Sequence, residues 1–479
     1  MERQLSIIPK PVSIKYGEGV FQSRGIPSII KKEGKLPIQT EHENEAYRLT
    51  ISKENITLEA STPAGMFHGE QTFRQLVLSE QSFMENNDNT LILPCAEIID
   101  YPRFSWRGFM LDSSRYFYSV PFIKNLIDVL SMHHINRFHW HLTDDQGWRL
   151  PVKEYPLLTE IGSRRLDRRF PDFTYTDGFY TEDDIREIVK YAADRHIEVI
   201  PEVDLPGHTS AILAAYPGLG CTGGPYRVED RFGIFEDVLC AGNDQIMDLF
   251  AKIFDTLIAL FPSKWVHIGG DEVLFNRWQE CPKCQKRLEE LGLEKPQELQ
   301  SWITQKLVQL LSERGKTAIG WDEILDNCEK YKLPKEAVVM SWRGNEGGNH
   351  ASSLGHNVIM SPSTEGCYLD YVHTNTPEEI GRTYAVSTVY SGYSMDPVTP
   401  QMTEKEAAFV LGGQCNLWSE VIYAGKIAEY MIFPRLCAIA EAVWTPRENK
   451  NFEDFSQRLK THQKRLDILG INQYRGPLR

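Results

Sequence analysis

The sequence predicts an α/β protein in which a (β/α)8 barrel follows a small α/β domain. From Arg107 onward, short apolar runs alternate with amphipathic helical stretches, a pattern typical of parallel strands joined by helices. Eight of these runs are suitable for strands, and eight strands close a barrel of this type. We therefore expect a small domain over residues 1–100 and a barrel with a C-terminal helix over residues 101–479.

The first hundred residues contain the pattern of a small mixed sheet with one helix. Residues 46–52 and 56–60 alternate as strands and are separated by a turn-prone segment, and residues 91–99 resemble a further strand. Thr62 followed by Pro63 is a favourable helix start, because the hydroxyl can cap the helix and proline suits its first position. This helix is expected to extend to about Leu78.

The strand–helix alternation defines the expected barrel. The candidate strands cover residues 108–111, 137–142, 197–203, 265–269, 317–321, 338–342, 357–361 and 409–413. The candidate helices include residues 120–133, 182–195, 244–260, 298–314 and 428–443, and a polar amphipathic helix over 452–469 stops at Gly470. An open doubly wound sheet is the alternative, but its first strand would lead into a glycine-rich phosphate loop, which residues 111–115 do not resemble.

Composition excludes several classes of partner. The net charge of −14 argues against a nucleic-acid surface, which needs a basic footprint, and against docking on an anionic membrane. No run approaches the ~20 apolar residues of a membrane span. Residues 1–10 lack the apolar core of a secretory signal. We expect a cytoplasmic protein if Met1 is native, or a secreted or periplasmic one if a leader has been removed. A homodimer is one assembly that the sequence leaves open.

Nine cysteines are scattered along the chain, which is not the pattern of a disulfide framework. Cys281 and Cys284 form a single Cys-Pro-Lys-Cys motif. A structural zinc site usually needs a second such pair, or histidines at matching spacing, and none follows the motif. The spacing therefore favours reduced structural thiols over a metal site.

Carboxylate, aromatic and basic side chains follow the predicted strands. Barrel active sites are built at the carboxyl ends of the strands, so we expect these side chains to converge. They are Arg115, Asp144, Asp145, Glu202, Asp204, His208, Asp271, Glu272, Trp321, Trp342, Tyr368, Asp370, Trp418 and Glu420. Charged groups bind sugar hydroxyls and aromatic rings stack on the C–H faces of sugars. The combination favours carbohydrate chemistry.

Asp271 and Glu272 are the most informative of these residues. Neighbours on a regular strand point to opposite faces, so both carboxylates can face a substrate only if the strand ends near Gly270. Gly269 and Gly270 permit such a break. Two crowded carboxylates repel, and one should retain its proton to higher pH and serve as a general acid. The alternative is a pair that caps a helix or forms ion pairs.

Other residues admit structural interpretations. Arg115 could hold sugar hydroxyls or form an ion pair at the rim, and each tryptophan could simply fill the barrel. A metal-dependent amide hydrolase is a rival hypothesis, built on His139, His141, Asp144, His208 and His267. Buried histidines satisfied by hydrogen bonds are the alternative, and no tightly spaced metal motif is present. We expect neither a metal nor a cofactor.

Four segments resemble the family-20 glycoside hydrolases, the β-N-acetylhexosaminidases. They are Arg-Gly-Phe-Met-Leu-Asp-Ser-Ser-Arg at 107–115, His-Trp-His-Leu-Thr-Asp-Asp-Gln-Gly-Trp at 139–148, Pro-Glu-Val-Asp-Leu-Pro-Gly-His at 201–208 and His-Ile-Gly-Gly-Asp-Glu at 267–272. The resemblance is colinear from about Ile7 to Trp444. It includes the small N-terminal module, whose Thr-Pro-Ala-Gly helix start at 62–65 is similar to that of the family.

The resemblance implies a retaining mechanism in which the 2-acetamido oxygen of the substrate attacks the anomeric carbon. Glu272 would act as general acid and then base, Asp271 would orient the acetamido N–H, and Tyr368 would donate to its oxygen. The matched pocket walls are Trp321, Trp342 and Trp418, the matched hydroxyl-binding residues are Arg115, Asp370 and Glu420, and Asp144 with His208 match a supporting dyad. The residues alone do not distinguish substrate assistance from an enzyme nucleophile.

These observations predict an exo-acting glycoside hydrolase that removes terminal, non-reducing β-linked N-acetyl-D-hexosamine, either the gluco or the galacto epimer, from oligosaccharides or glycoconjugates. The expected partner is a glycan substrate. Release of a disaccharide, as by lacto-N-biosidases, is one alternative. A barrel that binds amino sugars without cutting them is another, although the intact pair of Asp271 and Glu272 argues against it.

Overall fold

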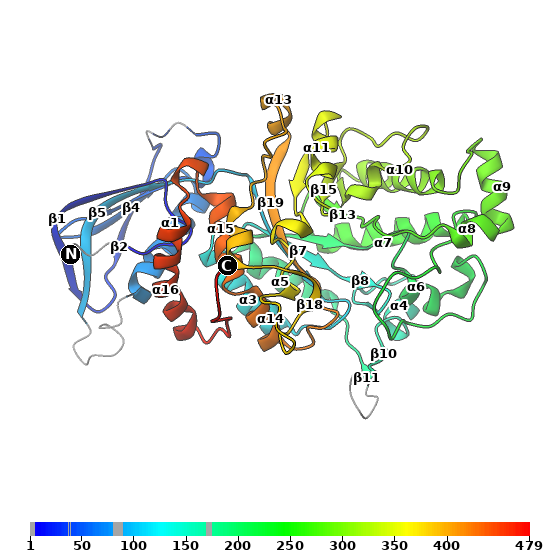
Figure 1. Ribbon diagram of the computed structural model, residues 1–479, viewed down its shortest axis with the longest axis horizontal. Helices are drawn as coiled ribbons and strands as arrows, with labels where there is room; N and C mark the ends of the chain where they lie inside the picture. Colours follow the sequence, from blue (N-terminus) through cyan, green and yellow to red (C-terminus); the bar gives the residue numbers. More distant parts are fainter. Residues whose placement is uncertain (1–4, 37, 39, 80–89, 169–174) are drawn as a thin grey trace.

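The computed structural model describes residues 5–36, 38, 40–79, 90–168 and 175–479. These residues form an elongated molecule with a five-stranded sheet at one end, a closed barrel in the middle and helices at the other end (Figure 1). The predicted fold class, a barrel preceded by a small α/β domain, is confirmed.

The N-terminal sheet has the strand order β1-β5-β3-β4-β2. Its strands are β1 (Ser13–Arg24), β2 (Ile29–Glu33), β3 (Tyr47–Ile51), β4 (Ile56–Ala60) and β5 (Thr90–Asp100), and helix α1 (Pro63–Ser79) follows β4. The helix start is as predicted, since the Gly65 amide donates to Thr62 Oγ1 at 3.2 Å. The sequence analysis missed β1 and β2, because both are largely exposed and lack the alternation of a half-buried strand.

Eight parallel strands close the barrel in the order β6-β7-β12-β13-β14-β15-β16-β19. They are β6 (Trp106–Asp112), β7 (Arg137–His141), β12 (Glu198–Glu202), β13 (Trp265–His267), β14 (Thr317–Trp321), β15 (Val338–Ser341), β16 (Val358–Met360) and β19 (Val410–Leu417). All eight predicted strands are present. Their carboxyl ends therefore meet at one face of the barrel, where the intervening connections form the rim.

The helices between these strands surround the barrel. The longer ones are α3 (Val120–Met132), α5 (Glu182–Ala193), α7 (Gln245–Leu260), α9 (Pro282–Glu290), α10 (Glu298–Ser312), α11 (Glu346–Ser353), α14 (Gly425–Ile432) and α15 (Arg435–Trp444). The prediction of one helix over 428–443 is wrong. Two helices meet at Phe433 and Pro434, because proline lacks the N–H that would continue the first helix.

Short elements lie within the connections. They are α4 (Leu157–Glu160), α6 (Ser210–Ala215), α8 (Asn276–Glu280), α12 (Val389–Ser394) and α13 (Glu404–Ala407), with the strand pairs β8 (Thr143–Asp144) and β9 (Gly147–Trp148), β10 (Arg165–Leu166) and β11 (Tyr175–Thr176), and β17 (Tyr371–Val372) and β18 (Arg382–Val386). The connections after β7, β12 and β16 are thus elaborate, which gives the rim its shape.

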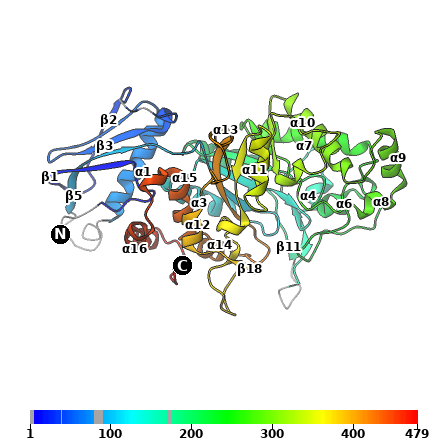
Figure 2. The same cartoon turned by 45° about the horizontal axis from the view of Figure 1, so that its top comes forward.

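The C-terminal helix α16 (Phe452–Ile468) lies between the two parts of the molecule, beside α1 and α15 (Figures 1 and 2). Arg458 donates to Glu441 of α15 and to the Ile7 carbonyl oxygen, each at 2.7 Å. Arg465 donates to Gln75 Oε1 of α1 at 3.2 Å. One helix near the end of the chain therefore binds the first described residues, the N-terminal domain and the barrel together.

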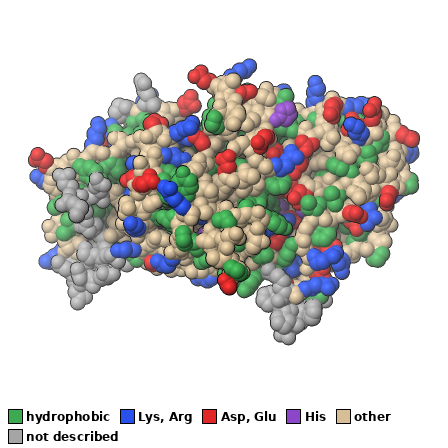
Figure 3. Space-filling model, viewed as in Figure 1, with side chains coloured by type: hydrophobic (Ala, Val, Ile, Leu, Met, Phe, Trp, Pro, Cys, Tyr) green, Lys and Arg blue, Asp and Glu red, His purple; other side chains and the backbone are tan. Residues whose placement is uncertain are grey.

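Charged side chains of both signs are interspersed over the face of the molecule drawn in Figure 3. The net charge of −14 is thus not gathered into a single patch on this face. Among the described residues, the helices are too short or too polar to cross a membrane.

Candidate active site

A cavity of about 480 Å³ opens at the carboxyl ends of the barrel strands. Eight of the predicted rim residues line it: Arg115, Asp271, Glu272, Trp321, Trp342, Tyr368, Trp418 and Glu420. Gly233, Ile234, Tyr371, Arg382 and Tyr384 complete the lining. The carboxylates, the aromatic rings and the arginines thus meet in one pocket, as the strand ends predicted.

The break before the carboxylate pair has the predicted form. Strand β13 ends at His267, and Gly269 and Gly270 have φ values of 68° and 98°. A Cβ atom on Gly269 would lie 1.7 Å from Asp204 Oδ1, so only glycine fits there. Glu272 itself has φ of 52°, a left-handed conformation that non-glycine residues rarely adopt. These backbone turns bring both carboxylates to the cavity.

Asp271 is buried against a second carboxyl group. Asp204 Oδ1 accepts from the Gly270 amide at 3.0 Å, and carboxylate oxygens of Asp204 and Asp271 lie within 4.8 Å of each other. Burial raises the pKa of Asp204 to about 7, and burial together with the neighbouring Asp204 charge raises the pKa of Asp271. Two carboxylates in contact in a dry site cannot both ionise easily, so this pair holds one proton into the neutral range.

Glu272 lies in a wetter environment beside a histidine. Its side chain is 32% exposed, and its Oε2 is 3.5 Å from His208 Nε2. Burial acts to raise the pKa of Glu272, but the hydrogen bond from His208 and its charge outweigh burial, and the net shift is downward. We expected crowding within the Asp271–Glu272 pair to raise the pKa of the member that serves as general acid, and for Glu272 this prediction is wrong. The raised pKa belongs to Asp271, because Asp271 is the more deeply buried of the two and faces Asp204.

His208 is held behind the pair by two aspartates. Its Nδ1 lies 2.9 Å from Asp145 Oδ2 and 3.3 Å from Asp144 Oδ1. Burial lowers the pKa of His208, but these carboxylates outweigh burial and raise it well above its ordinary value. The predicted contact between Asp144 and His208 is present, with Asp145 as a closer partner. Asp144, Asp145 and His208 are not among the residues that line the cavity. A direct contact of Asp144 or His208 with substrate therefore stays a prediction.

Arg115 combines the two roles that the sequence left open. Its guanidinium donates to Asp144 Oδ2 at 2.7 Å, to Asp112 Oδ2 at 3.1 Å and to Gln146 Oε1 at 3.0 Å. It also lies over the Trp418 ring, 5.0 Å from its centroid. These contacts fix the guanidinium plane at the cavity wall and leave further N–H donors for a ligand.

The aromatic walls are oriented by hydrogen bonds to carboxylates. Trp321 Nε1 donates to Glu202 Oε1 at 3.0 Å, and Trp342 Nε1 donates to Glu323 Oε2 at 2.8 Å. The rings of Trp342 and Tyr368 are nearly parallel, at 14°, with centroids 6.1 Å apart. The indole N–H groups of Trp321 and Trp342 are thus satisfied within the protein, and both rings line the cavity.

Asp370 and Glu420 are joined by a residue that the sequence analysis missed. Arg382 Nη1 lies 2.7 Å from Glu420 Oε1 and 3.9 Å from Asp370 Oδ2. Asp370 is fully buried, its oxygens have no hydrogen-bond partner among the described residues, and burial raises its pKa to about 7. A buried carboxyl group without a protein donor is suited to receive hydroxyl hydrogens from a ligand.

Five lining residues carried no signal in the sequence. Arg382 and Tyr384 come from β18, and Tyr371 from β17, within the connection between β16 and β19. Gly233 and Ile234 come from the connection after β12. None directly follows a barrel strand, and the spacing of a long connection does not reveal which of its residues fold back over the pocket.

The histidines of the rival metal hypothesis surround a carboxylate. His139 Nε2 and His267 Nδ1 lie 2.8 and 3.0 Å from Glu202, and His141 Nδ1 lies 2.5 Å from it. His141 also contacts Asp144 at 3.0 Å, so the histidines around Glu202 are connected to the group in which Asp144 and Asp145 face His208. Glu202 in turn orients Trp321, so this network also supports the pocket.

Outside the cavity, the structure groups the Cys-Pro-Lys-Cys motif with two earlier cysteines. No second cysteine pair follows Cys281 and Cys284, but Cys221 and Cys240 precede them and fold against them. The sequence analysis missed this grouping because the two earlier cysteines are far apart in the chain and match no short motif.

Comparisons with known proteins agree over both parts of the chain. The profile described as "Glycosyl hydrolase family 20, catalytic domain" matches residues 104–447, and "Glycosyl hydrolase family 20, domain 2" matches residues 31–101. A β-hexosaminidase of Porphyromonas gingivalis is 42% identical over 91% of this chain, which spans only 55% of that protein. A β-hexosaminidase of Akkermansia muciniphila is 33% identical, covering 96% of this chain and 90% of its own length.

Solved structures give the same result. A crystal structure of a β-N-acetylhexosaminidase superposes with a TM-score of 0.88 at 31% identity, covering 99% of this chain and 97% of its own. The exo-β-N-acetylglucosaminidase of Vibrio harveyi, in complex with N-acetylglucosamine, superposes with a TM-score of 0.88 at 30% identity, covering 99% and 80% respectively. The likeness therefore extends over the N-terminal domain and the barrel together.

Proposed function

Because the chain belongs to glycosyl hydrolase family 20, we propose that it is an exo-acting β-N-acetylhexosaminidase that removes terminal, non-reducing β-linked N-acetyl-D-hexosamine from oligosaccharides or glycoconjugates. The observation that carries this proposal is the pair Asp271 and Glu272, adjacent in sequence but held in different environments at the wall of one aromatic-lined cavity. N-acetylglucosamine-containing glycans are the substrate class that the relatives support.

In the first step, Glu272 donates its proton to the glycosidic oxygen as the acetamido oxygen of the substrate attacks the anomeric carbon. The glycosidic bond breaks, the remainder of the glycan leaves as an alcohol, and an oxazolinium ring forms. Asp271 accepts a hydrogen bond from the acetamido N–H and stabilises its growing positive charge. The proton held by Asp204 and Asp271 belongs on Asp204, which leaves Asp271 ionised and fixed by its neighbour.

In the second step, water attacks the anomeric carbon from the side that the leaving alcohol has vacated. The Glu272 carboxylate takes the proton of that water, and the ring opens to the free sugar with the original anomeric configuration. The downward shift of the Glu272 pKa favours the carboxylate in the open site. A bound sugar shields its partly exposed side chain from water, and this desolvation raises the pKa for the first step.

The other lining residues, together with Asp370 beside them, select the sugar. Tyr368 donates a hydrogen bond to the acetamido oxygen. This contact fixes the position of the oxygen and so lowers the entropic cost of its attack on the anomeric carbon. Trp321, Trp342 and Trp418 enclose the acetamido group and the ring face, and Arg115, Asp370 and Glu420 bind the hydroxyls. Arg382 joins this set through its contacts with Asp370 and Glu420.

A pair of aryl glycosides tests the proposal directly. An aryl N-acetyl-β-D-glucosaminide should be hydrolysed, whereas the matching β-D-glucoside has no acetamido nucleophile and should be inert. Equal turnover of the two would rule out substrate assistance, and no turnover of either would favour the sugar-binding alternative. End-labelled chitotetraose separates the remaining case: stepwise release of monosaccharide supports the proposal, and release of disaccharide contradicts it.

A further inference from the structure

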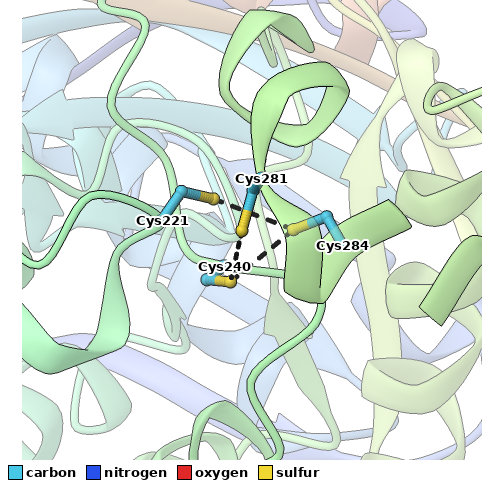
Figure 4. A group of neighbouring side chains, drawn as sticks. All are labelled: Cys221, Cys240, Cys281 and Cys284. Atoms are coloured by element: carbon cyan, nitrogen blue, oxygen red, sulfur yellow. Dashed lines mark hydrogen bonds between the residues drawn. The ribbon is translucent and has the colours of Figure 1, made fainter. Parts of the chain in front are cut away.

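Four cysteine sulfurs from three segments meet outside the catalytic cavity (Figure 4). Cys240 Sγ lies 3.7 Å from Cys281 Sγ and 3.6 Å from Cys284 Sγ, and Cys221 Sγ lies 3.7 Å from Cys284 Sγ. All four sulfurs are within 4.8 Å of one another. Three of the cysteines are buried, and Cys221 is partly buried.

We infer that Cys221, Cys240, Cys281 and Cys284 form a structural Zn²⁺ site. A zinc–sulfur bond of ~2.3 Å in a tetrahedron places neighbouring sulfurs about 3.8 Å apart, close to the three measured distances. Four protein thiolates fill the coordination sphere, which is the closed arrangement of structural rather than catalytic zinc. The same distances are far longer than the ~2.05 Å of a disulfide bond.

The surrounding backbone is shaped for such a site. Cys281 precedes α9 and Cys284 lies in its first turn, so the Cys-Pro-Lys-Cys motif presents both sulfurs on one side of a helix start. Gly242, two residues after Cys240, packs against this motif so closely that a Cβ atom would lie 2.2 Å from the Lys283 carbonyl carbon.

The connection between Cys221 and Cys240 needs an additional constraint. Residues 220–244, all of which the structure describes, form no helix and no strand apart from one bridge between Gly220 and Leu239. Irregular connections of this length are uncommon unless they are functional or constrained. A metal ion joined to both ends of the segment, and to α9, supplies that constraint.

This segment reaches the catalytic cavity. Gly233 and Ile234 line the pocket, and the Glu229 amide donates to the Asp145 carbonyl oxygen at 2.9 Å. On the other side, α8 is held to the segment because Trp278 Nε1 donates to the Leu239 carbonyl oxygen at 2.9 Å. The zinc site therefore fixes one wall of the pocket without contacting the sugar. This effect on the pocket rests on the proposed function, whereas metal binding itself does not.

Metal content tests the inference independently of activity. The untagged chain is purified under reducing conditions from a zinc-supplemented culture, and its metals are measured by mass spectrometry. We expect close to one zinc per chain in the wild type and loss of that zinc in the double variant Cys240→Ser/Cys284→Ser. Cys328→Ser, which alters a thiol elsewhere in the barrel, is the matched control and should retain the metal.

A second measurement, made on the wild type, tests the inference even if the double variant fails to fold. Titration of the native wild type with a mercurial should release zinc to a coloured chelator in step with the reaction of four thiols. Iron in place of zinc, disulfide-bonded pairs among the four cysteines, or a reduced protein that takes up no zinc would each overturn the assignment. Removal of the metal should also lower Tm and raise KM for the aryl glycoside several-fold with little change in kcat. An inactive chain that still holds one zinc would contradict the proposed function and leave the zinc site intact.

Discussion

The catalytic pair and the cysteine cluster arise from the same two strand–helix connections, those that follow β12 and β13. The pair needs only the first turns after the strands: Asp204 and His208 after β12, and Asp271 and Glu272 after β13. The cysteines lie further along both connections and meet away from the cavity. The barrel strands thus fix the positions of residues near the strand ends. Residues further along the connections need additional contacts to hold them in place.

The two regions should therefore fail in different ways when they are altered. Changes at Asp271 and Glu272 should remove activity and leave Tm nearly unchanged. Changes at the cysteines should lower Tm and weaken substrate binding while the chemical step survives. The predictions below test this division, beginning with the largest expected effect.

Glu272→Gln should reduce kcat for chitobiose by about 10²- to 10⁴-fold, because the glycosidic oxygen loses its proton donor. A nitrophenyl leaving group needs little protonation to depart, so the rate of the first step should fall much less for a nitrophenyl glycoside. Steady-state kinetics on both substrates measure the difference. Glu236→Gln, on an exposed part of the connection, is the matched control and should behave as wild type. An equal loss on both substrates would contradict the acid role.

Asp271→Asn should reduce kcat by about 10²- to 10³-fold even with a nitrophenyl leaving group, because a neutral amide cannot stabilise the positive charge of the oxazolinium ring. Its sensitivity to the leaving group should resemble that of the wild type, in contrast to Glu272→Gln. Rates across aryl glycosides with leaving groups of different pKa measure this sensitivity. Retention of full activity by Asp271→Asn would refute the proposed division of roles.

Asp204→Asn should change how stability depends on pH. The pKa of Asp204 is about 7 in the folded protein and near 3.9 in an unfolded chain. The protonated group therefore stabilises the fold fully below pH 4, and this contribution is lost as pH rises towards 7. Asparagine mimics the protonated acid at every pH. The Tm of the variant should thus gain about 2 to 5 °C on wild type between pH 5 and pH 8. Parallel Tm curves for the two proteins would contradict the raised pKa.

Ile234→Ala should have the smallest effect. Ile234 lines the cavity but is 48% exposed. A bound sugar could therefore bury only part of its side chain. We expect KM to rise about two- to five-fold with kcat and Tm unchanged. Because Ile234 lies on the segment between Cys221 and Cys240, its KM effect should resemble that of zinc removal. A large fall in kcat would show that the segment takes part in chemistry.

Much of the barrel was predictable because its strands are short apolar runs and its helices are amphipathic. The same alternation located Asp271, Glu272, Trp321 and Trp418, since each lies at or just beyond a strand end. The break at Gly269 and Gly270 followed from the need to turn two consecutive side chains to one face. These features depend on local sequence and on the geometry common to all such barrels.

The remaining features depend on tertiary structure. Arg382 reaches Glu420 from a separate strand pair, and no spacing in the sequence indicates that contact. The raised pKa of Asp271 requires Asp204, which comes from a neighbouring strand. The exposed strand β1 lacks apolar alternation. The division between α14 and α15 is different, because Pro434 is a local signal that predicts a break in the helix.

The position of α16 has a consequence for the order of events during synthesis. Arg458 and Arg465 bind Ile7 and Gln75 across more than 380 positions of sequence. These contacts cannot form until residues 452–468 have left the ribosome, after the barrel strands have emerged. The contribution of α16 to domain docking is thus a late step, because contacts of such long range close the largest loops in the chain. Earlier contacts, such as that of Gln75 Nε2 with the Met132 carbonyl oxygen, can form first, so a nascent chain stalled before residue 452 should hold the two parts together less firmly than the full chain.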